Sequence, residues 1–230
     1  MAEFISNSSY FGVVITLFIY LISVNIKKKV RHTLFNPMLI TIVVTISILL
    51  LFDISYESYN SSAKYISYLL TPTTICLALP LYEQLDKLKE NFTAIMLGIL
   101  SGVLTSMGSV FLLCRLFNLS KVDFVTLLPK SITSAIGMYV SEEFGGYVSI
   151  TVAVIILTGL VGSIISEIIM KVLKIKNRIA KGVAMGTAFH AIGTSKAMEI
   201  GEIEGAIASL SIVVAGLMTV LLAGIFVGVY

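Results

Sequence analysis

Two polar stretches in an otherwise apolar chain carry the side chains that could do chemistry. The first is LLPKSITSAIG at residues 127–137, where four polar residues follow Pro129: Lys130, Ser131, Thr133 and Ser134. At a helix start, hydroxyls, free N–H groups and the positive end of the helix dipole together bind anions. We therefore predict an anion-binding half-helix here, with Lys130 as an added positive charge. The alternative is that Pro129 only kinks a spanning helix, whose hydroxyls bond to its own carbonyls.

The second stretch, GTAFHAIGTSKAMEIGE at residues 186–202, holds one of only two histidines. Gly186 and Thr187 are expected to open another half-helix, with Gly193 as a further break. His190 and Thr194 are four residues apart and so share a helix face. His190 could bond an anionic substrate or carry a coupling proton. The alternative is a histidine satisfied by a neighbouring helix.

The charged residues of the second stretch differ in their expected roles. Lys196 and Glu199 are three residues apart, a spacing that predicts an ion pair. Glu199 is expected to lie nearer mid-depth, where a carboxylate could bind a cation or a proton. Glu202 and Glu204 are expected at the membrane–water interface. We therefore rank Glu199 above the other two glutamates as a site residue.

Composition places these stretches in a helical membrane protein. The chain has 230 residues, of which 57% are hydrophobic and 13% charged, whereas soluble domains carry about 25% charged residues. Its mean hydropathy is +0.99. Spans of about 20 residues are expected at 10–26, 38–54, 63–83, 92–114, 147–170 and 205–229. With the two interrupted stretches, 122–144 and 177–202, this predicts an all-α polytopic fold of about six to eight segments.

An internal repeat organises the chain beyond residue 60. A shift of 57 residues pairs LLTPTTICLALPLY with TLLPKSITSAIGMY and Pro72 with Pro129. Thr73 and Thr74, which follow Pro72, join the candidate site by this correspondence. We predict N-terminal membrane helices over 1–60 and a transport domain over 61–230. The repeat units of this domain are expected at 62–118, 119–175 and 176–230.

Charge then predicts the topology. The basic runs at 28–33, 87–89 and 171–181 should all face the cytoplasm. If every apolar stretch crossed the membrane, the third run would lie outside. We therefore predict that 122–144 enters and leaves by one face, and that 177–202 does so from the opposite face, as in the inverted repeats of transporters. In the alternative, both stretches are broken helices that cross fully.

Several classes of chemistry have no support in the sequence. The two histidines lie far apart without cysteine partners, so no metal site is expected. Cys76 and Cys114 lie within apolar stretches and predict no disulfide. No nucleotide loop or nucleophile elbow is present. The chain is thus expected to be neither an enzyme nor a nucleic-acid-binding protein, and to hold no cofactor.

The blocks LLPKSITSAIGMYVSEEFGG and AKGVAMGTAFHAIGTSKAMEIGEIEGAIASL resemble the LrgB/CidB family of bacterial membrane proteins. The resemblance covers roughly residues 60–230. The matching positions are Pro129, Lys130, Ser131, Thr133, Gly186, Thr187, His190, Gly193, Thr194, Glu199 and Glu202. It implies a multi-pass protein of the bacterial inner membrane. Within the family, it implies either antiholin-like control of murein hydrolases with an LrgA/CidA-type partner, or carriage of glycolate, glycerate or pyruvate.

The polar residues at membrane depth favour the second function. A carrier of small monocarboxylates needs hydroxyls, half-helix starts and a cation, whereas a regulator that acts through protein partners does not. We therefore expect alternating-access transport, by a homo-oligomer, with protons or sodium as candidate coupling ions. The antiholin-like regulator is kept as the alternative.

Overall fold

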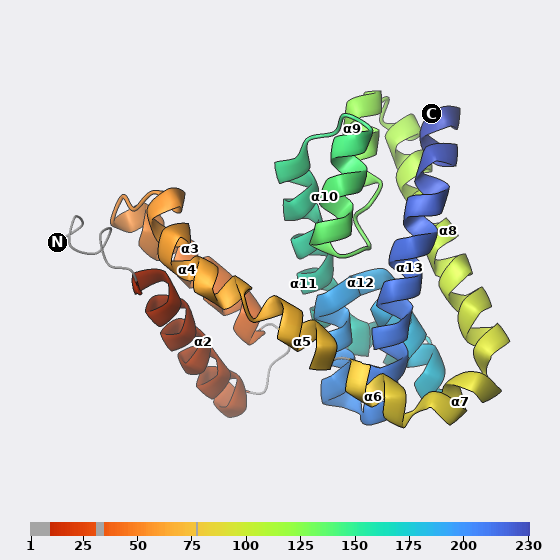
Figure 1. Ribbon diagram of the computed structural model, residues 1–230, viewed down its shortest axis with the longest axis horizontal. Coiled ribbons are helices and arrows are strands. Elements are labelled where there is room, and N and C mark those ends of the chain that lie inside the picture. The colour runs from red at the N-terminus through yellow and green to blue at the C-terminus, as the bar shows by residue number, and fades with distance from the viewer. Residues whose placement is uncertain (1–9, 31–34, 77) are drawn as a thin grey trace. The chain divides into compact units, whose positions relative to one another are not determined.

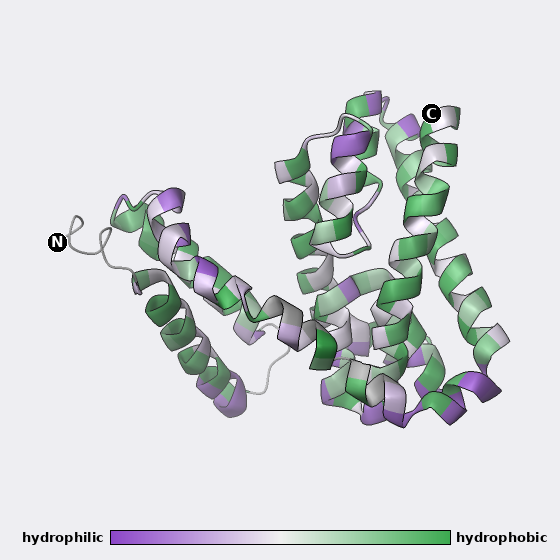
Figure 2. Ribbon diagram, viewed as in Figure 1, coloured by the Kyte–Doolittle hydropathy of each residue, from purple (hydrophilic) through white to green (hydrophobic). Residues whose placement is uncertain are grey.

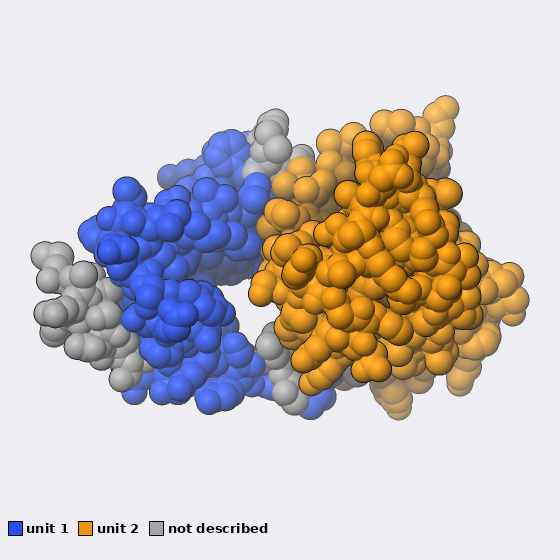
Figure 3. Space-filling view, turned by 90° about the horizontal axis from the view of Figure 1, so that it is seen from above, with its two compact units in different colours: residues 1–76 blue, residues 77–230 orange. Residues whose placement is uncertain are grey.

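The computed structural model describes residues 10–30, 35–76 and 78–230. It does not describe the side chains at 70, 71, 74, 78, 80 and 81. In the described residues every regular element is a helix, which confirms the predicted all-α class (Figure 1). The chain forms two compact units, 1–76 and 77–230 (Figure 3). The predicted functional boundary at residue 60 and the three repeat units stay predictions.

The first unit contains α2 (Phe11–Val30), α3 (Pro37–Leu51), α4 (Tyr56–Ser67) and α5 (Leu70–Cys76). Helix α2 packs against both α3 and α4, and the backbone N–H of Gly12 donates to Ser62 Oγ at 2.7 Å. Asn36 caps α3, whose first residue is proline, a residue that suits a helix start because it has no N–H to satisfy.

The predicted single span over 63–83 is wrong. Helix α4 ends at Ser67 and α5 at Cys76, and a further helix, α6, covers Ala78–Glu83. Pro72 and Pro80 are the third residues of α5 and α6, so each lies in a first turn, where a proline is tolerated. Most of the polar segment at 53–65 is helical as well, and Ser55 caps α4 by accepting from the Ser58 N–H.

The second unit is built around three long apolar helices. These are α8 (Phe92–Leu116), α11 (Val148–Val172) and α13 (Glu202–Val229). Together with α2 they are the four described helices long and apolar enough to cross a membrane. A helix of 25 residues spans about 37 Å, more than the roughly 30 Å hydrocarbon core. Figure 2 shows hydrophobic residues along these helices and hydrophilic ones toward their ends, most of all in α7 (Leu85–Glu90).

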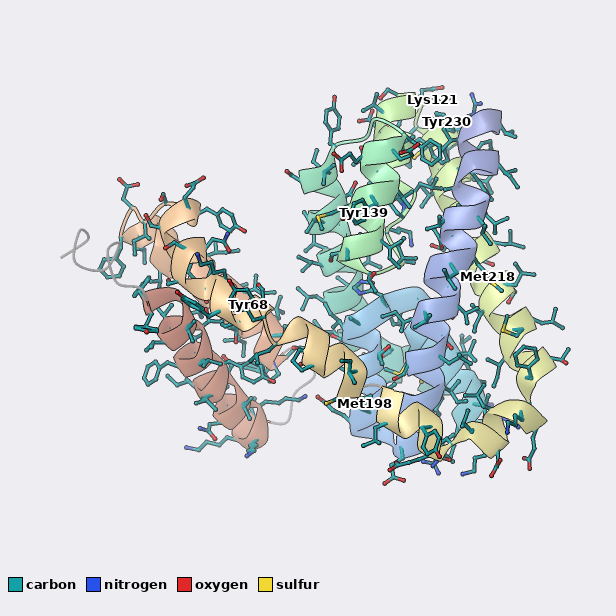
Figure 4. The ribbon with its side chains drawn as sticks, viewed as in Figure 1. Tyr68, Lys121, Tyr139, Met198, Met218 and Tyr230 are labelled. Atoms are coloured by element: carbon teal, nitrogen blue, oxygen red, sulfur yellow. The ribbon has the colours of Figure 1, made fainter. Side chains whose placement is uncertain are left out.

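The first interrupted stretch forms a re-entrant hairpin of α9 (Lys121–Leu127) and α10 (Ser134–Glu143). Its two limbs meet at the beginning of α11, where Thr151 Oγ1 donates to the Thr126 carbonyl and accepts from the Ser141 hydroxyl, both at 2.8 Å. The phenol of Tyr230, at the end of α13, donates to Leu119 O at 2.7 Å. The outer ends of the two limbs, here called the feet of the hairpin, therefore lie at the end of the unit where α13 finishes. Figure 4 shows Lys121, in the foot of α9, near Tyr230.

The second interrupted stretch also doubles back, within α12 (Arg178–Ile200). Arg178 at its beginning pairs at 2.9 Å with Glu204, which follows its end. A Cβ added to Gly193 would meet the Met185 carbonyl, so the two limbs lie against each other. Val183 lies beside Gly98, near the beginning of α8, so this hairpin has its feet at the opposite end of the unit.

Neither stretch therefore crosses the unit, and full crossing by broken helices, the alternative left open by the sequence, is wrong. Helix α11 follows the first hairpin and α13 follows the second, and they run in opposite directions (Figure 1). The basic runs at 87–89 and 171–181 share the end where α8 begins and α11 finishes. This is the arrangement that the positive-inside rule predicts for a cytoplasmic face.

This topology makes a direct labelling prediction. In a background without Cys76 and Cys114, cysteines placed at Lys121 and Glu143 should both react with an impermeant maleimide from outside the cell. A cysteine at Asn177 should react only after the membrane is opened. All three positions are exposed in the structure. Labelling of Lys121 and Glu143 from opposite faces would show that the first stretch crosses.

Candidate functional site

The tip of the first hairpin is a short polar turn at residues 128–133. Thr133 caps α10 by accepting from the Ile136 N–H at 3.5 Å, so the half-helix predicted after Pro129 begins at Ser134. Lys130 Nζ donates to Ser131 Oγ at 3.2 Å. Pro129 and Ser131 are buried, while Lys130 and Ser134 are half-buried. The tip therefore presents a cation, hydroxyls and a helix start in one place.

The tip of the second hairpin is His190. Its backbone has φ 44° and ψ −134°, the only non-helical residue within α12. The helix therefore breaks at His190, and the predicted breaks at Gly186 and Gly193 are wrong. Thr187 lies inside the first limb rather than at a helix start. A positive φ is strained for a residue with a side chain, so its neighbours must hold this conformation in place.

The His190 ring is satisfied by α11 and the His190 carbonyl by a residue of α12 itself. His190 Nε2 lies 2.8 Å from the carbonyl oxygen of Ile155 in α11, and must carry the proton to donate there. Thr194 Oγ1 donates to the His190 carbonyl at 2.9 Å. A Cβ at Gly159 would lie 2.7 Å from the His190 ring, so Gly159 makes room for it. The alternative in which a neighbouring helix satisfies His190 describes this imidazole better than a free ligand does.

The two glycines that were predicted as breaks allow close packing instead. A Cβ at Gly186 would lie 2.8 Å from both the Ala208 Cα and the Ser211 Cβ of α13. Gly193 lies against the Met185 carbonyl and the Phe189 side chain. These contacts draw the two limbs of α12 together and seat them on α13.

The tip of the first hairpin and the first limb of the second, close to its tip, lie beside one turn of α8. Ser106 Oγ of α8 donates to Ser131 Oγ at 2.9 Å. One turn earlier on the same helix, a Cβ at Gly102 would lie 2.7 Å from Thr187 Cγ2. Positions four residues apart on a helix are separated by about 6 Å along its axis. The side chain of Ile155, whose carbonyl binds His190, also lies against Gly137 of the first hairpin.

Thr187 carries a buried hydroxyl without a hydrogen-bond partner in the described residues. Only 5% of this residue is exposed. A buried polar group left unpaired costs about 1–3 kcal/mol of folding free energy. Packing alone therefore does not explain why position 187 carries a hydroxyl. The Thr187 hydroxyl is the clearest unused hydrogen-bonding group between the two hairpins.

The charged residues are arranged differently from the predicted ranking. Lys196 does pair with Glu199, at 3.1 Å, and also with Glu167 of α11 at 2.8 Å. The Glu199 side chain is 53% exposed, whereas that of Glu204 is 4% exposed and held by Arg178. Glu204, rather than Glu199, is therefore the buried carboxylate of the two, while their depth in the membrane stays a prediction. The second hairpin ends at Ile200, before Glu204, and Arg178 at the beginning of its first limb lies against the Glu204 carboxylate.

Other predicted residues lie outside this arrangement. Pro72 and Thr73 are exposed residues of α5, in the first unit. The side chain of Thr74 lies outside the described residues. Glu202 is exposed at the beginning of α13.

Sequence reasoning missed the groups that complete the site. Ser106, the Ile155 carbonyl and Arg178 belong to long helices, and no local motif marks them. Gly102 carried a weak signal, because the repeat aligns small residues at this position of each clean span.

Comparison with known proteins decides the family. The model of the LrgB-like family matches residues 16–229. The chain belongs to the LrgB-like family. It is 38% identical over 207 residues to the holin-like protein CidB of Staphylococcus epidermidis, covering 90% of each chain. It is 37% identical over 221 residues to the antiholin-like protein LrgB of Bacillus subtilis, covering 96% of each. No solved structure matches it.

LrgB-like membership confirms the resemblance drawn from the polar blocks, and it extends the match into the first unit, to residue 16. With its candidate spans, this chain is a multi-pass membrane protein. The relatives are named for holin-like and antiholin-like behaviour, and none of these names describes an enzyme or a carrier.

Proposed function

We propose that this protein carries small monocarboxylates across the bacterial inner membrane, between two opposed re-entrant hairpins. The observation that carries the proposal is the meeting of the tips beside α8. There, Ser131 and Thr187 contact α8 at Ser106 and Gly102, one helical turn apart; Lys130 bonds to Ser131, and the Thr187 hydroxyl has no partner in the described residues. A carboxylate needs a cation and hydroxyl donors, and these tips supply both at membrane depth.

The fold suits alternating access. Non-helical backbone at membrane depth is tolerated where protein or a water-filled path surrounds it, and opposed half-helices are typical of secondary transporters. Sliding of one hairpin against α8 would expose the tips to one face and then the other. The bond from His190 to Ile155 would hold the second tip in register. Coupling to protons or sodium, and assembly as a homo-oligomer, belong to the same proposal.

The names of the relatives support a second candidate function more directly than they support the first. In it, the protein acts as an antiholin-like regulator, as the names of its relatives suggest. The family resemblance adds control of murein hydrolase activity with an LrgA/CidA-type membrane partner to this second candidate. Such a regulator has no need of a lysine and an unpaired hydroxyl at the hairpin tips. The two functions therefore differ in what a change at the tips should do.

Uptake of labelled pyruvate and glycolate into proteoliposomes tests the carrier directly. Lys130→Gln removes a charge-assisted hydrogen bond worth about 1.5–3 kcal/mol, so we expect uptake at low substrate to fall by about 10- to 100-fold. Thr187→Val removes the unpaired hydroxyl with little change of shape. We expect it to lower uptake while leaving the unfolding temperature unchanged or raised.

Thr105→Val is the matched control, because this exposed α8 residue bonds only to its own helix, at Ser101 O. It should transport normally. Absence of uptake of any small carboxylate by the wild-type protein would remove the carrier function. If the wild type restores regulated autolysis in a deletion strain, and Lys130→Gln does so equally well, the antiholin-like function is favoured.

A further inference from the structure

A charged cavity lies at the base of the second hairpin, away from the tips. It has a volume of about 640 Å³ and opens where α11 ends and α12 begins. Four lysines line it: Lys171, Lys174, Lys176 and Lys181. The two glutamates of its wall, Glu167 and Glu199, both pair with Lys196. The cavity therefore carries more positive charge than its own carboxylates balance.

The backbone turn that carries Lys174 is unusual for a lysine. The Ile175 N–H bonds to Met170 O at 2.8 Å and the Lys174 N–H to Lys171 O at 3.2 Å, which is a Schellman turn. Lys174 takes the left-handed position of this turn, with φ 54°. Equivalent turns in this chain place Asp53, Asn118 and Gly145 there, residues that tolerate this conformation. A lysine is thus kept where the backbone favours other residues.

The surroundings of the cavity place it at the level of lipid headgroups. Val172 and Leu173, next to the lysines, are 72% and 64% exposed, and an apolar face of this kind requires lipid around it. Met170 and Ile175 supply apolar contacts inside the cavity. Basic pockets at helix ends on the cytoplasmic side bind phosphate headgroups. Charge, position and apolar lining together favour a ligand with both a phosphate and an acyl part.

We propose that this cavity binds the phosphate group of an anionic ligand, and that the ligand is a membrane phospholipid. The lysines of the α11–α12 turn contact the phosphate, and the apolar residues contact the first carbons of the acyl chains. Binding here joins the end of α11 to both limbs of the second hairpin, because Lys181 and Glu199 come from opposite limbs. The inference is independent of the function proposed for the tips.

Native mass spectrometry of the full chain in neutral detergent tests this site. The protein is titrated separately with phosphatidylglycerol, phosphatidylcholine and soluble glycerol phosphate. We expect selective retention of phosphatidylglycerol. In Lys174→Asn/Lys176→Gln, retention should weaken by about 25-fold, since each lysine near a membrane surface contributes roughly a factor of five.

The variants are chosen so that a folding defect cannot imitate lost binding. An asparagine in place of Lys174 would match Asn118 at the equivalent turn of α8, so the unfolding temperature should stay equal or rise. Lys87→Gln/Lys89→Gln removes the same charge from exposed lysines at the same end of the unit and should bind as the wild type does. Glycerol phosphate binding that is lost in the cavity variant alone would support the phosphate site and make its ligand soluble. Two results would overturn the proposed site. One is equal retention of the two lipids with no glycerol phosphate bound, and the other is equal loss of phosphatidylglycerol binding in both lysine variants.

Discussion

Replacing Arg178 with alanine should lower the free energy of unfolding, because it removes the cation that pairs with a buried carboxylate. Arg178 donates through Nε to both carboxylate oxygens of Glu204 at 3.0 Å, and its Nη2 lies 2.9 Å from Oε2. The Arg178 side chain is half-exposed, but that of Glu204 is 4% exposed. Removing the arginine leaves a buried carboxylate without its cation, which costs more than an exposed ion pair contributes. The feet of the second hairpin would separate first.

The chain itself supplies the reporter for this experiment. Cys114 is buried and Cys76 exposed, so in a Cys76→Ser background a thiol-reactive dye reports unfolding through Cys114. We expect Arg178→Ala to lower the midpoint of thermal unfolding by more than a change at an exposed ion pair does. Lys196→Ala, which breaks partly exposed pairs, is the control and should cost less than about 1 kcal/mol. Arg178→Met/Glu204→Gln should recover part of the loss, because no charge stays buried. Equal effects of Arg178→Ala and Lys196→Ala would contradict this account.

Replacing Gly186 with alanine should destabilise the protein by about 2–3 kcal/mol. The added methyl group would lie 2.8 Å from the Ala208 Cα and from the Ser211 Cβ, and closer still to the Ala208 carbonyl. These atoms belong to the backbone and first side-chain carbons of α13, so they cannot rotate away. Relief would require the first limb of the hairpin to move off α13.

Gly108→Ala is the matched control for this substitution. Gly108 lies inside α8, and no atom lies within 4 Å of an added Cβ. Alanine is favoured over glycine in a helix, so this variant should gain about 0.5–1 kcal/mol. The same dye assay would compare the two. A loss of stability at both positions, or at neither, would show that the contact with α13 does not decide the outcome at Gly186.

Both effects concern the base and limbs of the second hairpin, while the proposed carriage depends on its tip. If hairpin movement is part of the cycle, Arg178 and Gly186 variants that still fold should lose transport along with stability. Lys130→Gln, by contrast, should lose transport without losing stability. These substitutions therefore separate the scaffold of the hairpins from the groups that would contact a carboxylate.

The sequence by itself determined the membrane class, the long spans and the first hairpin. Apolar runs longer than about 20 residues require lipid whatever their neighbours are. Pro129, followed by Lys130 and Ser131, interrupts a helix locally, because a proline lacks the N–H that the helix needs. The positive-inside rule predicted that 122–144 turns back, and the internal repeat extended this prediction to 177–202, since loop charge and repeats are properties of the chain itself. The family followed from the same polar blocks.

Only the tertiary structure decided where the second hairpin breaks and which carboxylate is buried. Gly186 and Gly193 looked like breaks because glycine weakens helices, yet the break lies at His190, where Ile155, 35 residues away, accepts its hydrogen bond. Glu199 and Glu204 are alike in type and local setting, and only the return of α12 covers Glu204 and sets it against Arg178. Hydropathy and proline act through near neighbours in the chain. Burial and hydrogen-bond satisfaction depend on partners that only folding brings together.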